Sequence, residues 1–120
     1  GIQNNKIRFF FVLAFNKHFD FKRESAVALA KTLKKVSVSF QAEVEGVESF
    51  KEYILITALL PFDVAPANFI ETTLDACTMV GKNPIFQKDY LVTNVKKPTP
   101  EQIMLFLKQL PLDRDPVSIR

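Results

Sequence analysis

The 120-residue sequence has no tryptophan, one cysteine, one histidine and three glycines. A single cysteine excludes an internal disulfide, and one cysteine with one histidine cannot supply the ligands of a structural zinc site. Gly1, Gly46 and Gly81 lie too far apart to build a phosphate-cradling glycine loop. We therefore expect no cofactor and no metal site, and stability must come from an apolar core.

Phenylalanine is the abundant residue, with 12 copies, and 48% of the chain is hydrophobic against 24% charged. This composition excludes collagen-like and disordered chains. A chain of this length folds as one domain and buries roughly two-thirds of its unfolded surface. We expect a soluble α+β domain over residues 1–112 and a polar tail over residues 113–120.

The charge is mildly basic: 16 Lys and Arg against 13 Asp and Glu give a formal net charge of +3. Three surplus charges neutralise few phosphates, so general electrostatic attraction to nucleic acid is small unless the charges cluster. Small clusters do occur along the chain: Lys22 with Arg23, then Lys31, Lys34 and Lys35, then Lys96 with Lys97.

The chain does not begin with methionine, which indicates a processed or truncated start. The apolar run at residues 9–15 follows Lys6 and Arg8, like the start of a signal peptide, but no small-residue cleavage site comes after it. The run is also too short to span a bilayer. We interpret it as a buried strand and expect a cytoplasmic protein with no membrane span.

Hydrophobic periodicity predicts the order of the elements in the first half of the chain. Residues 6–15 are apolar on both faces, as in a central strand. Residues 22–36 have helical spacing, with Asp20 as the expected N-cap and the three lysines near the helix end. Residues 37–45 alternate between polar and apolar and predict an edge strand, followed by a turn at residues 46–51.

The second half repeats this plan. Residues 52–60 are apolar on both faces, Pro66 begins a helix that Gly81 caps, and residues 84–95 are extended, with a bend into a hairpin at Lys88 and Asp89. The last helix begins with a capping box formed by Thr99 and Gln102. It ends at Pro111.

The order strand, helix, strand, strand, helix, strand predicts a ferredoxin-like βαββαβ plait, here with an extra C-terminal helix. In that plait the first and third strands are central, and these are the two strands that are apolar on both faces. Residues 53–110 also resemble, in layout, the type III secretion chaperone-like domains. This resemblance implies an alternative α+β fold.

The plait places both crossover helices on one sheet face, so the other face needs a cover. The C-terminal helix has an apolar stripe that can cover it within the chain or bind another chain: Ile103, Phe106, Leu107 and Leu110.

Candidate site residues are few. An RNA-recognition surface needs a glycine and exposed aromatics on the third strand, which reads Tyr-Ile-Leu-Ile-Thr-Ala-Leu at residues 53–59; Phe9, Phe10 and Phe11 are therefore expected in the core. Cys77 falls on an apolar helix stripe and is expected to be buried and unreactive. One group of loop residues could form a small binding site: Lys17, His18, Asp20, Lys51 and Lys82.

No catalytic constellation is visible in the sequence, so we do not expect an enzyme. The favoured function is binding or assembly through protein–protein contact, including self-association through the sheet face. The first alternative is nucleic-acid binding through basic loops and helix ends. The second is a small-ligand site or enzyme centred on His18.

Overall fold

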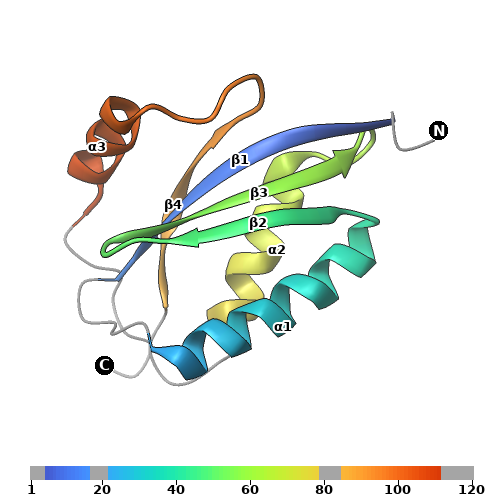
Figure 1. Ribbon diagram of the computed structural model, residues 1–120, viewed down its shortest axis with the longest axis horizontal. Coiled ribbons are helices and arrows are strands. Elements are labelled where there is room, and N and C mark those ends of the chain that lie inside the picture. Colours follow the sequence, from blue (N-terminus) through green and yellow to red (C-terminus); the bar gives the residue numbers. More distant parts are fainter. Residues whose placement is uncertain (1–4, 17–21, 79–84, 112–120) are drawn as a thin grey trace.

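The computed structural model describes residues 5–16, 22–78 and 85–111. In order, the chain forms β1 (Lys6–Phe15), α1 (Arg23–Phe40), β2 (Glu43–Ser49), β3 (Tyr53–Pro61), α2 (Pro66–Thr78), β4 (Phe86–Thr93) and α3 (Pro100–Gln109). All strand pairs are antiparallel and the sheet order is β2-β3-β1-β4, with β1 and β3 in the centre (Figure 1). This confirms the predicted ferredoxin-like plait with its extra helix over the chaperone-like alternative.

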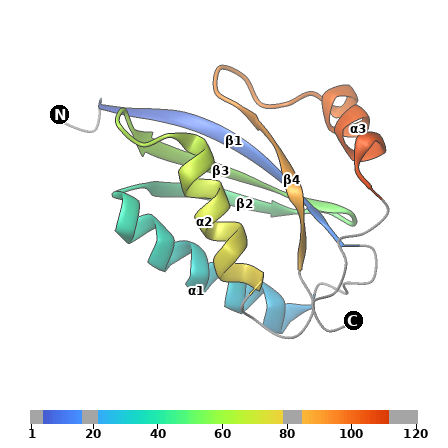
Figure 2. The same ribbon diagram turned by 180° about the vertical axis from the view of Figure 1, so that it is seen from behind.

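The main core lies between the sheet and the layer formed by α1 and α2 (Figure 2). Alternate residues of the central strands point into it, because side chains on a strand alternate between the two faces. Phe11 and Ile56 are fully buried opposite each other on β1 and β3. Phe69 of α2 packs against Phe11 with ring centroids 5.7 Å apart. Phe11 is thus core, as predicted, whereas Phe9 and Phe10 are partly buried: Phe9 packs against this core and Phe10 against a smaller cluster on the other sheet face.

The predicted boundary between the first helix and the second strand is wrong. Residues 37–40 were expected in a strand, but α1 continues through Phe40 and β2 begins at Glu43. Leu29, Leu33 and Val36 are buried, and Phe40 packs against the same cluster, so the helical stripe extends past the predicted end. Tertiary packing outweighs the local alternation of valine and serine.

The expected start of this helix also needs correction. The N-cap of α1 is Lys22, whose backbone amide donates to Ser25 Oγ at 3.4 Å; Asp20, expected there, lies outside the described residues. At the other end, Gln41 ends the helix in the left-handed conformation with φ 56°. Its backbone amide donates to the Val38 carbonyl at 3.2 Å, as in a helix C-cap.

The turn predicted at residues 46–51 is shorter than expected. Gly46 lies inside β2, where the register against β3 shifts between Val44 and Gly46. The connection closes at Phe50, whose amide donates to the Tyr53 carbonyl at 2.8 Å. The Phe50 and Tyr53 rings stack with centroids 4.6 Å apart, so aromatic contact stabilises this hairpin end.

The helix predicted from Pro66 is confirmed as α2, which is described to Thr78; its expected cap, Gly81, lies outside the described residues. The hairpin predicted at Lys88 and Asp89 is wrong, because β4 is one strand. A register shift against β1 between Leu13 and Phe15 falls opposite this part of β4. The local polarity therefore marks an irregularity in the strand, not a reversal of the chain.

Helix α3 begins as predicted, with Thr99 Oγ1 accepting from the Gln102 amide at 3.1 Å and Gln102 Oε1 accepting from the Thr99 amide at 2.9 Å. The helix lies on the sheet face opposite α1 and α2 (Figure 2). There Ile103 packs with Val12 and Leu55 in a second, smaller cluster. The Lys97 ammonium lies 3.1 Å from a Glu48 carboxylate oxygen and links the connection before α3 to β2.

Cys77 is 2% exposed on the inner side of α2, and its burial raises the pKa of the thiol to about 11. At pH 8 only about one thiol in a thousand is then ionised, so we expect almost no reaction with an aromatic disulfide reagent until the protein is denatured. Since the folded pKa exceeds the unfolded value of ~8.5, this thiol contributes stability below about pH 8.5 that is lost as pH rises through 11. Rapid labelling of the native protein at pH 8 would contradict the buried placement.

Candidate functional site

The loop cluster expected around His18 falls mostly outside the described residues. Lys17, His18, Asp20 and Lys82 lie there, and only Lys51 is described, exposed beside the β2–β3 connection. The structure therefore gives no geometry for this group, and a site at His18 stays a prediction from the sequence.

The lysines of α1 form an exposed basic surface. Lys31, Lys34 and Lys35 are all exposed, and their spacing of three and four residues places them on adjoining positions of one helix side. The sequence placed them at the helix end, but α1 continues to Phe40 and its last turn has no basic residue. These lysines therefore act as a surface along the middle of the helix and not as a helix-end cluster. We call them the lysine face.

The lysine face has no acidic partner among the described residues. The ion pairs among the described residues include Lys6 with Glu43, Arg8 with Glu45 and Lys97 with Glu48, all with carboxylates of β2, and none of these pairs involves the lysine face. Because the lysine face has no ion pair of this kind among the described residues, its positive charge is open to a ligand.

The sheet face opposite α1 carries paired charges instead. Arg8 Nε donates to Glu45 Oε1 at 2.6 Å and Arg8 Nη2 donates to Oε2 at 3.0 Å, a two-bond contact between β1 and β2. This hydrogen bonding lowers the pKa of Glu45 and raises the pKa of Arg8. Lys97 is paired with Glu48, so of the predicted pair Lys96–Lys97 only Lys96 is without an ion pair among the described residues. This face is therefore a poor electrostatic match for phosphate.

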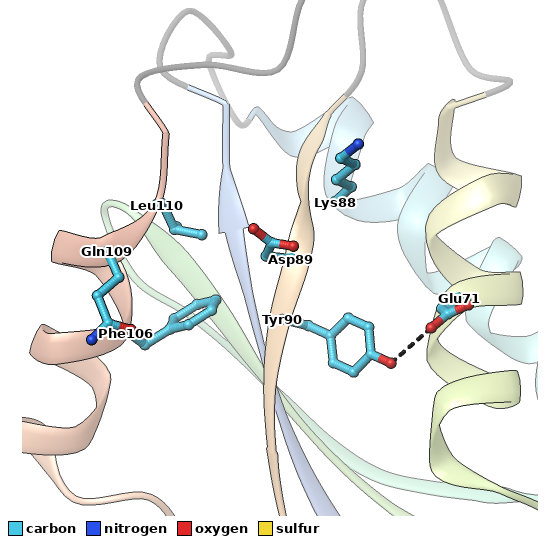
Figure 3. A pocket seen from close by; sticks show the side chains of 7 residues that line it. All are labelled: Glu71, Lys88, Asp89, Tyr90, Phe106, Gln109 and Leu110. Atoms are coloured by element: carbon cyan, nitrogen blue, oxygen red, sulfur yellow. Dashed lines mark hydrogen bonds between the residues drawn. The ribbon is translucent and has the colours of Figure 1, made fainter.

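A cleft of about 600 Å³ lies beside β4, between α2 and α3 (Figure 3). Glu71 of α2 borders one side, and Phe106, Gln109 and Leu110 border the other. The strand itself contributes Lys88, Asp89 and Tyr90. Three consecutive elements of the chain, α2, β4 and α3, thus build this hollow, which we call the β4 cleft.

The β4 cleft combines acidic and aromatic groups. Tyr90 Oη donates to Glu71 Oε2 at 2.9 Å, and partial burial together with this carboxylate raises the pKa of the phenol. Asp89 points to the α3 side of the strand, whereas Tyr90 points toward Glu71 (Figure 3). Of the stripe predicted to cover the sheet, Ile103 is buried on it, and Phe106 and Leu107 pack against the same cluster. Phe106 and Leu110 also line this cleft.

Comparison with known proteins places the fold. No family model matches the sequence, and no curated protein matches it. Among solved structures, a protein of Deinococcus radiodurans R1 assigned as a transposase superposes with a TM-score of 0.71 at 17% identity, over 86% of this chain and 89% of that one. A REP-associated tyrosine transposase bound to a REP hairpin superposes with a TM-score of 0.64 at 14% identity, over 87% of this chain and 64% of that one. The fold is shared.

Two absences hold for the described ranges. No group of three or more His, Cys, Asp or Glu side chains there is arranged to hold a metal ion. Likewise, none of the helices in those ranges has the length and hydrophobicity needed to cross a membrane.

Proposed function

We propose that this domain binds DNA through the lysine face of α1. The observation that carries the proposal is the exposure of Lys31, Lys34 and Lys35 side by side, without an acidic partner among the described residues. The shared fold supports it, because one of the structural neighbours is bound to a nucleic-acid hairpin. Nucleic-acid binding is the first alternative from the sequence, which expects basic loops and helix ends to make the contact. The present proposal uses lysines in the middle of α1 instead.

The expected interaction is electrostatic. Each lysine that neutralises a phosphate releases condensed counterions, so three contacts predict a slope of about −2.7 for log K against log salt on duplex DNA, or about −2.1 on single strands. Contacts of this kind position the protein on the backbone and do not by themselves select a sequence. We therefore expect weak, salt-sensitive binding with little dependence on base sequence.

A DNA hairpin titrated by fluorescence anisotropy between ~50 and ~200 mM NaCl tests the proposal. The variant Lys31→Glu/Lys34→Glu/Lys35→Glu should lose at least about tenfold in affinity and flatten the salt slope. A matched variant, Lys51→Glu/Lys88→Glu/Lys108→Glu, changes the net charge equally at exposed lysines on other surfaces and should change the affinity far less. Equal losses in the two variants, or no binding at ~50 mM salt, would overturn the proposal.

Protein–protein contact, which the sequence favoured, is the second candidate function. It is supported by the β4 cleft and by Met104 and Leu105, which are 56% and 60% exposed on α3. Apolar side chains exposed next to one another on a helix are typical of a contact surface. The lysine face and α3 lie on opposite sides of the sheet, so the two functions do not compete for one surface.

A further inference from the structure

We propose that the β4 cleft binds an extended, positively charged peptide of another protein, which adds as a strand to the free edge of β4. The proposal rests on the second candidate function, protein contact, and is independent of DNA binding. It specifies both the location of the contact and the chemistry of the partner.

The first argument is the open edge of β4. This strand is the last in the order β2-β3-β1-β4 and, in the described part of the chain, pairs only with β1. Every second residue of an edge strand turns its backbone N–H and C=O outward, which is the template for strand addition. Residues 90–93 form the regular part of β4, paired with Leu13, Val12, Phe11 and Phe10 in register.

The other sheet edge is protected, which makes β4 the available one. The β2 edge bears Glu43, Glu45 and Glu48, each held in an ion pair. Charged side chains along an edge oppose pairing with another strand. On β4 the charges are confined to Lys88 and Asp89, and the regularly paired stretch Tyr90-Leu91-Val92-Thr93 has none.

The second argument is the shape of the space beside this edge. The cleft volume of about 600 Å³ lies in the ordinary range of ligand pockets, roughly 300–1,000 Å³. A further hollow of about 300 Å³ adjoins it along α2, since Glu71, Lys88 and Asp89 line both. Figure 3 shows β4 between α2 and α3, so a strand added beside it would lie between the two helices, next to these hollows.

The third argument is the charge and polarity of the two walls. Phe106 and Leu110 form an apolar wall on the α3 side, whereas Glu71 lies on the α2 side. Glu71 and Asp89 outnumber Lys88, so the cleft favours a cationic ligand. Asp89 lies on the α3 side beside the apolar wall and Glu71 lies on the α2 side, so each side of the cleft carries one carboxylate. The fitting peptide therefore combines apolar residues with Lys or Arg.

A peptide of eight residues, the length of β4, provides the probe. Alternating Leu and Lys should bind with measurable affinity by isothermal titration, while alternating Leu and Glu should not. Backbone N-methylation at every second residue removes peptide donors and should weaken binding at least about tenfold if the peptide adds as a strand. Unchanged affinity of the methylated peptide would overturn strand addition.

Charge reversal tests the location. Glu71→Lys/Asp89→Lys changes two exposed residues and should reverse the preference, so that the Leu-Glu peptide binds and the Leu-Lys peptide does not. The control Glu43→Lys/Glu48→Lys places the same charge on the β2 edge and should leave the preference as it was. If the control reverses it instead, the peptide binds elsewhere and the proposal fails. The lysine-face variant should keep full peptide affinity, which separates this test from the DNA experiment.

Discussion

Truncation after Pro98, which removes α3, is expected to lower the free energy of unfolding by about 3–6 kcal/mol. Ile103 is 8% exposed and packs on Val12 and Leu55, which are themselves 0% and 2% exposed. A fully buried aliphatic side chain contributes about 1.5–3 kcal/mol, and the partly buried Phe106 and Leu107 contribute a fraction of that each. The loss is a large part of the ~5–15 kcal/mol that holds a small domain together.

Urea unfolding followed by circular dichroism measures this effect. Truncation after Pro111 is the matched control, since it leaves α3 in place and should preserve the unfolding midpoint. Ile103→Ala should lower stability by about 2–4 kcal/mol, whereas Leu105→Ala, exposed on the same helix, should change it by less than about 0.5 kcal/mol. An unaltered midpoint after removal of α3 would show that the helix is not part of the core.

Phe69→Ala is expected to destabilise the domain by about 3–5 kcal/mol, which brings a domain of ordinary stability close to unfolding. The Phe69 side chain is fully buried, with its ring 5.7 Å from that of Phe11 and 5.8 Å from that of Phe40. It therefore joins α1, α2 and the sheet at one point. Its removal leaves a cavity that surrounding side chains cannot fill without moving two helices.

Phe62→Ala is the control for this measurement, because Phe62 is 66% exposed directly after β3. The unfolding temperature should fall by roughly 12–20 °C for Phe69→Ala, at about 4 °C per kcal/mol, and by almost nothing for Phe62→Ala. A small effect at Phe69 would mean that the contact between α2 and the sheet is looser than the structure indicates.

The order of the elements could be predicted from sequence because burial on two faces is a strong signal. The strands β1 and β3 are apolar on both sides, which predicts their central positions from the sequence alone. The capping box at Thr99 and Gln102 worked for a similar reason, since two side chains satisfy two backbone amides within one turn. Burial patterns and capping boxes each depend on a few neighbouring residues, so both can be recognised in the sequence.

The boundary after α1 could not be predicted from the local alternation alone. The segment Val36-Ser37-Val38-Ser39-Phe40 alternates as a strand does, and its valines favour extended structure. The competing signal was the spacing of Leu29, Leu33, Val36 and Phe40, which continues one helical stripe. Only contact with Phe69 and the sheet decides between the two patterns.

The candidate surfaces differ in the same way. The three lysines of the lysine face can be recognised in the sequence as a cluster. Their position in the middle of α1 cannot, because the helix continues to Phe40, past its predicted end. The β4 cleft was not visible at all, because Glu71, Tyr90 and Phe106 belong to three elements and meet only through packing. The sequence feature that belongs to this cleft is the polar pair Lys88–Asp89, which lies where the pairing of β4 with β1 is irregular.

The central position of β1 also has a consequence during synthesis on the ribosome. This strand emerges first, but its partners are β3 and β4, and Thr93 at the end of β4 pairs with Phe10. At ~5–20 residues per second, the phenylalanine-rich strand waits several seconds without either neighbour. A nascent chain with such a strand is a natural client for a chaperone that binds extended apolar segments. The sheet closes only when nearly the whole domain has left the exit tunnel.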